Sequence, residues 1–189
     1  MKEPLFEPYL RMMRIRKVLP TIRKVRMPRI LDIGCGWDAR FLKSIEPFVQ
    51  EAIGIDFKAP DLGNGRIKTL KKVLFDRLPF DDSSFHIVTM LAVLEHIAEP
   101  FLLAKEIHRV LIGGGYLVMT VPSRASKPIL EFLSYRLGVV SPDEIKDHKK
   151  YYNKKDIEKI FVPNGFHVEK HKYFQLGMNN FCIMKTFGK

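Results

Sequence analysis

Several things are scarce in this 189-residue chain, and each absence narrows what the chain can be. There are only two cysteines, Cys35 and Cys182, and no metal-ligand spacing joins them to histidines, so we expect neither a disulfide framework nor a metal site. Long apolar runs are also missing. The longest, residues 87–94, is far shorter than the roughly 20 residues that a transmembrane helix needs. The N-terminus shows no apolar secretory signal, which predicts a cytoplasmic location.

Acidic residues are also few, with 21 against 32 lysines and arginines, which gives a formal net charge of +11. Residues 1–29 alone hold nine lysines or arginines and two glutamates. Leu10, Met13, Val18 and Leu19 are interleaved with them at loosely helical spacing. We therefore expect residues 1–28 to form a basic, helical N-terminal extension. Such a helix either binds an anionic membrane surface, RNA or an acidic partner, or is a solvated helix that covers one edge of a sheet.

The rest of the chain, residues 29–189, is long enough and apolar enough for one domain with one substantial core. Apolar runs alternate with helical patterns, as a parallel sheet with crossover helices requires. Strands are expected at residues 29–33, 52–55, 69–75, 85–91 and 116–121, and helices at 39–45, 100–110 and 154–161. Two last runs, 166–174 and 180–185, predict an antiparallel strand pair that closes the sheet. Residues 123–152 form a polar insert that we expect to face the substrate.

The most informative stretch is a glycine loop after the first strand. Gly34-Cys-Gly36-Trp-Asp-Ala39 fits the dinucleotide pattern G-x-G-x-x-G/A, and Asp56 follows Gly36 by twenty residues. A dehydrogenase is therefore allowed by pattern alone. However, Asp32 and Asp38 place negative charge beside the loop, which is unfavourable next to a pyrophosphate and favourable next to a cationic amino acid. S-adenosylmethionine carries an ammonium and a sulfonium and has no phosphate, so the charges favour this cofactor.

Four segments, in order, resemble the motifs of class I S-adenosylmethionine-dependent methyltransferases. LDIGCGWDARFL resembles the first motif of that family, and GIDF matches its second strand, which ends in an acid. LPFDDSSFHIVTMLAVLEHIAEP and RVLIGGGYLVMTVPS are similar to the fourth and fifth strands, with their flanking turns, in its small-molecule branch. The resemblance is close over residues 29–123. It implies a Rossmann-like, doubly wound α/β fold with a mostly parallel seven-stranded sheet and an antiparallel C-terminal strand pair.

The resemblance also implies which residues hold the cofactor. The glycine loop approaches it closely, Asp56 accepts hydrogen bonds from the ribose hydroxyls, and Phe57 packs on the adenine. Asp38 replaces the third glycine of the family's loop, and we expect an aspartate there to tolerate left-handed backbone angles. The cofactor-binding residues predicted in this way are Asp32, Gly34, Cys35, Gly36, Asp56, Phe57, Asp76 and Leu91.

Catalysis and the methyl acceptor are less closely defined by the sequence. Methyl transfer requires alignment above all, and a hydroxyl acceptor also benefits from a base. His96 and His148 are the candidate bases. No Asn/Asp-Pro-Pro-Tyr/Phe sequence follows the fourth strand, which disfavours a flipped nucleobase and leaves a small molecule such as a sugar, a quinone-like compound or a lipid-linked intermediate. RNA methylation, a nicotinamide-dependent oxidoreductase and a non-catalytic cofactor-binding protein remain as alternatives.

Overall fold

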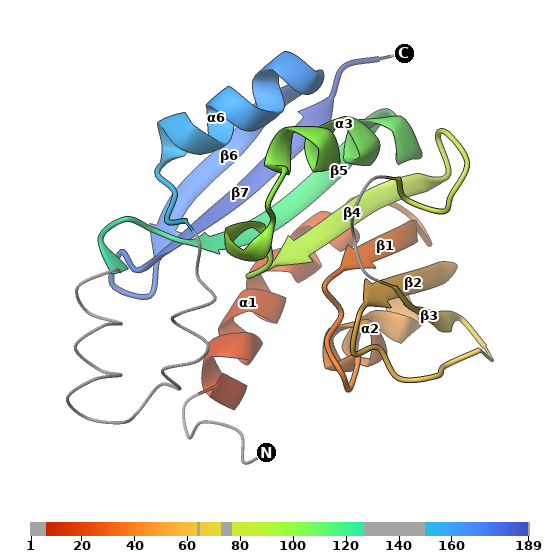
Figure 1. Ribbon diagram of the computed structural model, residues 1–189. Coiled ribbons are helices and arrows are strands. Elements are labelled where there is room, and N and C mark those ends of the chain that lie inside the picture. Colours follow the sequence, from red (N-terminus) through yellow and green to blue (C-terminus); the bar gives the residue numbers. More distant parts are fainter. Residues whose placement is uncertain (1–6, 64, 73–76, 127–149, 189) are drawn as a thin grey trace.

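A single seven-stranded sheet organises the computed structural model, which describes residues 7–63, 65–72, 77–126 and 150–188. The strand order is β3-β2-β1-β4-β5-β7-β6. Strands β1 to β5 are parallel, and β7 runs antiparallel to both β5 and β6, which confirms the predicted fold class (Figure 1). The strands are β1 (Arg29–Ile33), β2 (Glu51–Asp56), β3 (Ile67–Lys71), β4 (Phe85–Leu91), β5 (Leu111–Pro122), β6 (Phe166–Phe174) and β7 (Asn179–Thr186).

Helices cover both faces of this sheet, so the core has two layers. Helices α3 (Pro100–Val110) and α6 (Lys154–Phe161) bury their apolar sides against one face. Helices α1 (Glu7–Ile22) and α2 (Arg40–Ile45) pack on the other (Figure 1). The predicted bounds of α3 and α6 are confirmed, and Asn153 caps α6 by accepting a hydrogen bond from the backbone N–H of Asp156. Within the described ranges, no helix is both long and apolar enough to cross a membrane.

Strands β3 and β5 differ from the prediction by more than one residue, whereas β2 and β7 each extend one residue further at both ends. Strand β3 begins at Ile67, two residues early, and its predicted end at residue 75 lies outside the described residues. Strand β5 already begins at Leu111, although residues 113–115 are three glycines that we expected to separate the helix from the strand. A Cβ on Gly115 would lie 3.1 Å from the carbonyl oxygen of His86. The glycines therefore let β5 pass close to β4 and do not end the extended chain.

Helix α1 packs on the sheet through one side, and its Arg16 side chain is exposed. Val18 and Ile22 are fully buried in the same cluster as Ile87 of β4 and Val118 of β5. The ammonium of Lys17 lies 5.2 Å from the ring centroid of Phe174. The helix therefore covers a face of the sheet, and not an edge as the structural alternative assumed. The division of the chain at residue 28 stays a prediction.

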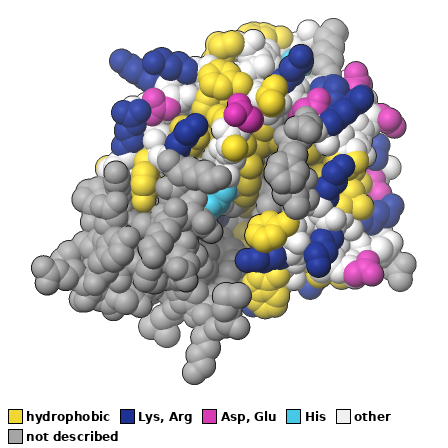
Figure 2. All heavy atoms as spheres, viewed as in Figure 1, with side chains coloured by type: hydrophobic (Ala, Val, Ile, Leu, Met, Phe, Trp, Pro, Cys, Tyr) yellow, Lys and Arg dark blue, Asp and Glu magenta, His cyan; other side chains and the backbone are white. Residues whose placement is uncertain are grey.

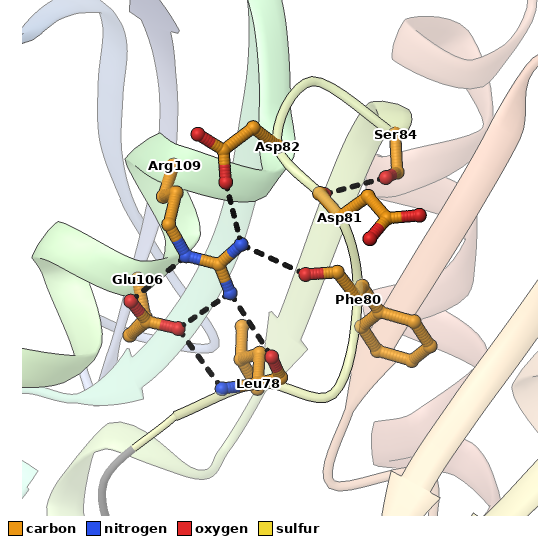
Figure 3. Close-up of polar contacts among 7 residues, drawn as sticks. All are labelled: Leu78, Phe80, Asp81, Asp82, Ser84, Glu106 and Arg109. Carbon is orange, nitrogen blue, oxygen red and sulfur yellow. Dashed lines mark hydrogen bonds and ion pairs between the residues drawn. The ribbon is translucent and has the colours of Figure 1, made fainter.

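The loop that leads into β4 is held by one arginine on α3 (Figure 3). The guanidinium of Arg109 donates to the carbonyl oxygens of Leu78 and Phe80, at 3.0 and 2.8 Å. It also donates to both carboxylate oxygens of Glu106, at 3.0 and 2.7 Å, and to Asp82 at 2.8 Å. Glu106 in turn accepts from the backbone N–H of Leu78 at 2.9 Å. The LPFDD segment of the sequence motif is thus held by Arg109 in a fixed conformation before β4 begins.

A second polar cluster holds the two chain segments that enclose the insert. The side chain of Asn180, on β7, is fully buried and donates to the carbonyl oxygens of Val121 and Tyr152 at 3.2 and 2.9 Å. Its amide oxygen lies 2.9 Å from Nε2 of His171. The hydroxyl of Ser123 donates to the carbonyl oxygen of Gly177 at 2.6 Å. Most of the insert lies outside the described residues, but both of its ends are fixed to the carboxyl edge of β5.

Candidate active site at the carboxyl edge of the sheet

The glycine loop lies where β1, β2 and β4 end. Gly34 and Gly36 have left-handed φ angles of +80° and +73°, which glycine adopts without steric cost. A Cβ on Gly34 would lie 2.2 Å from the Cγ2 atom of Val93, so the loop is pressed against the segment after β4. A Cβ on Gly36 would meet no atom within 4 Å. The loop therefore presents the backbone of Gly36 to open space, where a ligand can approach closely.

Asp56 connects this loop to the end of β2. Its Oδ2 atom accepts a hydrogen bond from the backbone N–H of Gly36 at 3.0 Å, and Oδ1 accepts from the N–H of Lys58 at 2.7 Å. The sequence places Asp56 twenty residues from Gly36, and the structure brings the two into direct contact. Each carboxylate oxygen has a second lone pair, so Asp56 can still accept hydrogen bonds from two neighbouring hydroxyls.

Asp32 lies in β1, two residues before Gly34. Its side chain is 2% exposed, and its Oδ1 atom accepts a hydrogen bond from the hydroxyl of Thr89 at 2.6 Å. Burial raises the pKa of Asp32 to about 7, although the Thr89 hydrogen bond opposes the shift. The carboxyl is thus partly protonated at neutral pH, whereas the sequence argument treats it as a fixed charge. A cation placed beside it would favour the ionised form.

The left-handed residue at the end of the loop is Ala39, with a φ angle of +49°, and not Asp38 as we expected. Ala39 precedes the first residue of α2 and is fully buried. Asp38 instead accepts a hydrogen bond from the backbone N–H of Arg40 at 3.3 Å and forms an ion pair with the Arg40 side chain at 2.6 Å. The aspartate therefore stabilises the start of α2, and the strain that the family's glycine avoids falls on the next residue.

Phe57 and Cys35, two of the predicted cofactor-binding residues, differ in the exposure of their side chains. Phe57 is 57% exposed beside the loop after β2, so its ring is free to pack on a planar group. The thiol of Cys35 is buried: a Cβ on Gly54 would lie 2.8 Å from its Sγ atom. Burial raises the pKa of Cys35 to about 12, so the sulfur is a protonated thiol and not a nucleophile. Any contact of Cys35 with a cofactor would come from its backbone.

The end of β4 forms the other side of the candidate site. Leu91 is partly buried, and Ala92 has a left-handed φ angle of +59° while its N–H donates to the carbonyl oxygen of Thr120 at 2.9 Å. A short 3-10 helix, η2 (Leu94–His96), follows. The side chain of His96 is exposed at this edge, which agrees with the predicted position. Asp76 and His148 lie outside the described residues, so their predicted roles stay predictions.

Sequence reasoning missed Glu95, the residue before His96. Glu95 is 1% exposed, and its Oε2 atom has no hydrogen-bond partner among the described residues. Burial raises the pKa of Glu95 to about 7, and the positive charge of Arg14 acts in the opposite direction. The only sequence signal was an acid directly after a buried strand, at the edge where ligands of doubly wound folds bind. Among the described residues, no group of three His, Cys, Asp or Glu side chains is placed to hold a metal ion.

Comparison with known proteins decides the family. A family model described as a methyltransferase domain matches residues 6–171. The chain belongs to this methyltransferase-domain family. The match includes α1, the glycine loop, Asp56 and the segment after β4, and it confirms the resemblance on which the cofactor prediction rests.

Individual relatives agree with this assignment. The chain is 34% identical over 113 residues to a demethylmenaquinone methyltransferase from Staphylococcus aureus, an alignment that covers 54% of this chain and 46% of the relative. The chain thus spans about half the length of the curated relatives it matches.

Solved structures share the fold at low identity. One, with a TM-score of 0.71 and 14% identity over 99% of this chain and 100% of the other, comes from a complex between the Haloferax volcanii Trm112 methyltransferase activator and a protein described as a methyltransferase. Another is an S-adenosylmethionine-dependent methyltransferase from Mesorhizobium loti, with a TM-score of 0.65 and 17% identity over 89% of this chain and 97% of the other.

The residues of this site fit the family's cofactor, S-adenosylmethionine. The open space at Gly36 gives room for the cofactor to approach the loop backbone. The two carboxylate oxygens of Asp56 suit a ribose diol, and Asp32 is an acid that becomes more ionised beside an ammonium. The exposed ring of Phe57 suits an adenine. All four groups come from the ends of β1 and β2, so they lie along one side of the edge.

Proposed function

We propose that this chain binds S-adenosylmethionine at the β1 and β2 ends and transfers its methyl group to a small-molecule acceptor with a hydroxylated aromatic ring, of the quinol type. The observation that carries the proposal is the hydrogen bond from Gly36 to Asp56. It holds the loop that a cofactor can approach closely next to the carboxylate that can bind the hydroxyls of a ribose. When bound, the cofactor supplies an electrophilic methyl group on a sulfonium.

The chain's own residues have separate tasks in this proposal. Asp56 orients the ribose through its free lone pairs, Asp32 pairs with the ammonium, and Phe57 packs on the adenine. The backbone around Leu91 faces the amino-acid part. Because methyl transfer is an in-line displacement, holding the donor and the acceptor at close range supplies most of the acceleration. His96 is exposed at the same edge and is proposed as an acceptor contact.

The relatives' printed activity supports the acceptor class. Demethylmenaquinone methyltransferases act, as their name says, on a quinone-type ring, and this chain is 34% identical to one of them over 113 residues. Sugars and lipid-linked intermediates should be assayed as alternative methyl acceptors. The absence of an Asn/Asp-Pro-Pro-Tyr/Phe sequence after β4 disfavours a nucleobase amine.

The test has two parts. Calorimetry should show S-adenosylhomocysteine binding to the wild type, at least ten-fold weaker binding to Asp56→Asn, and unchanged binding to the matched control Asp61→Asn, whose side chain is exposed. Tighter binding of NAD than of S-adenosylhomocysteine would refute the proposal. A methyl-labelled cofactor should then transfer label to dihydroxynaphthalene-type acceptors in preference to sugars. Preferential labelling of a sugar would overturn the acceptor class and leave the cofactor assignment intact.

Exposed arginines on and near α1 support a second proposal, which concerns the place in the cell where the protein binds its acceptor. Arg16, Arg23 and Arg26 are exposed on α1 and just after it. On the face that Figure 2 presents, Lys and Arg side chains are interspersed with Asp and Glu side chains. We propose that these arginines bind an anionic membrane surface, because apolar quinols reside in lipid. Sedimentation with phosphatidylglycerol vesicles should be strong at low salt and lost with phosphatidylcholine. Preferential binding to RNA in competition would refute this.

A further inference from the structure

Glu95 is the buried carboxyl at the edge where the acceptor would bind. It lies in η2, immediately after β4, and is 1% exposed. Glu95 interacts electrostatically with residues from two parts of the chain. The positive charge of Arg14 reaches it from α1, and its own charge acts on the hydroxyl of Tyr152, which precedes α6. Because α1 and α6 cover different faces, Glu95 lies over the carboxyl edge itself, between them.

Glu95 and Tyr152 both have unused hydrogen-bonding capacity. Among the residues that the structure describes, neither the buried Oε2 atom of Glu95 nor the buried hydroxyl oxygen of Tyr152 has a hydrogen-bond partner. Buried polar atoms are almost always hydrogen-bonded in folded proteins, so an exception calls for an explanation such as a catalytic role or a bound water. Tyr152 is also held in place, because its carbonyl oxygen accepts from the buried side chain of Asn180 at 2.9 Å. A fixed hydroxyl and an unpartnered carboxyl are suited to receive a polar group of a ligand.

We infer that Glu95 is a catalytic residue that takes the proton from the acceptor's hydroxyl group, with Tyr152 orienting that hydroxyl. This inference rests on the proposed methyl transfer. In the step, the O–H bond breaks and its proton moves to Oε2 of Glu95. The electron pair left on the hydroxyl oxygen forms the new O–C bond to the methyl carbon, and the S–C bond breaks with its pair remaining on sulfur. The proton on Glu95 then passes to solvent, and the carboxylate is restored.

Two features favour Glu95 over its neighbour for this task. The side chain of His96 is exposed, whereas Glu95 is shielded from water, which strengthens its interaction with a developing charge. Burial also brings the pKa of Glu95 to about 7, close to the value at which a base both holds and releases a proton at neutral pH. The charged or titratable groups that act on this pair are Arg14 on Glu95, and Asp156 on Tyr152.

The first experiment compares Glu95→Gln with Glu99→Gln, which removes an exposed carboxylate four residues away. With the labelled cofactor and the best acceptor, we expect Glu95→Gln to lower kcat at least 100-fold, while S-adenosylhomocysteine affinity changes less than three-fold. Glu95→Asp should recover part of the loss, and Glu99→Gln should match the wild type. If Glu95→Gln keeps kcat within three-fold, the inference is wrong and the methyl transfer stands. If the wild type does not bind S-adenosylhomocysteine, the proposed function itself is wrong.

A second measurement does not depend on turnover. Infrared difference spectra of the S-adenosylhomocysteine complex, wild type minus Glu95→Gln, should show a protonated carboxyl band at pH 6 that disappears by pH 8. Adding a hydroxyaromatic acceptor should shift this band, and Arg14→Met should move its midpoint to higher pH. A carboxyl that only holds α1 through Arg14 would be ionised throughout. An absent band at pH 6, or a band that the acceptor leaves unchanged, overturns the inference.

Discussion

Replacing Arg109 by methionine should destabilise the protein substantially, although this residue lies away from the candidate site. The guanidinium makes five hydrogen bonds, two of them to backbone carbonyl oxygens in the loop before β4 (Figure 3). The side chains of Arg109 and Glu106 are only 17% and 16% exposed, so water replaces the lost donors poorly. Methionine keeps most of the apolar stem and none of the donors.

The magnitude follows from these contacts. The bond to Asp82 contributes little, because that side chain is 72% exposed. The two carbonyl oxygens each lose a donor at about 1 kcal/mol, and Glu106 loses its counter-ion at a further 1–2 kcal/mol after allowance for partial exposure. The expected loss is about 3 kcal/mol, which corresponds to a Tm lower by roughly 6–12 °C in a chain of this size.

Urea unfolding followed by circular dichroism would measure this loss. Lys105→Met, on the exposed side of the same helix, is the matched control and should change the free energy of unfolding by less than about 0.5 kcal/mol. Arg109→Lys should fall between the two, because an ammonium cannot reproduce the planar set of donors. A free energy of unfolding for Arg109→Met within 1 kcal/mol of the wild type would show that the loop is held by other contacts.

Three further predictions concern the edge of the sheet. Gly34→Ala should bind S-adenosylhomocysteine at least ten-fold more weakly in calorimetry, because its φ angle is +80° and the new methyl would collide with Val93; unchanged affinity would show that the loop relaxes easily. The raised pKa of Asp32, about 7, means that the folded protein retains a proton which the unfolded chain loses above pH 4, so this residue makes stability fall as the pH rises from about 4 to 7. Asp32→Asn should therefore become more stable relative to the wild type over that window, by about 4 kcal/mol at pH 8 without cofactor, and parallel pH profiles of unfolding would contradict this. Asn180→Ala should lower the free energy of unfolding by about 2–4 kcal/mol, since the carbonyl oxygens of Val121 and Tyr152 lose their buried donor; thermal melting that matches the wild type would exclude the proposed anchoring.

Strong periodic patterns allowed much of the fold to be predicted. Residues 85–91 form one apolar run, and 100–110 repeat apolar side chains at helical spacing behind a proline, so both elements have the predicted bounds. The start of β5 was not predictable in this way. Three consecutive glycines usually interrupt structure, but here Gly115 permits the close approach of the β4 backbone and Gly114 takes a left-handed φ angle of +73° in the irregular start of β5.

The candidate site was predictable where it depends on backbone geometry and not where it depends on burial. Gly36 and Asp56 stand at a recognisable spacing, and the structure joins them by a hydrogen bond. The protonation of Asp32 and the isolation of Glu95 depend on which side chains surround them, and those come from distant segments such as β4 and α1. The left-handed angle at Ala39 was also missed, because aspartate tolerates such angles better than alanine and the local preference pointed to Asp38.

The position of β7 between β5 and β6 has a consequence for how the molecule is made. Strand β5 is buried on both faces along its second half and forms hydrogen bonds with β7 from Tyr116 to Pro122. During synthesis that ladder has no partner until residues 179–186 have left the ribosome, more than sixty positions later. Throughout that interval an apolar strand with open backbone groups is available to any other nascent chain. We therefore expect newly made protein to depend on chaperone protection at this strand, while the completed sheet does not.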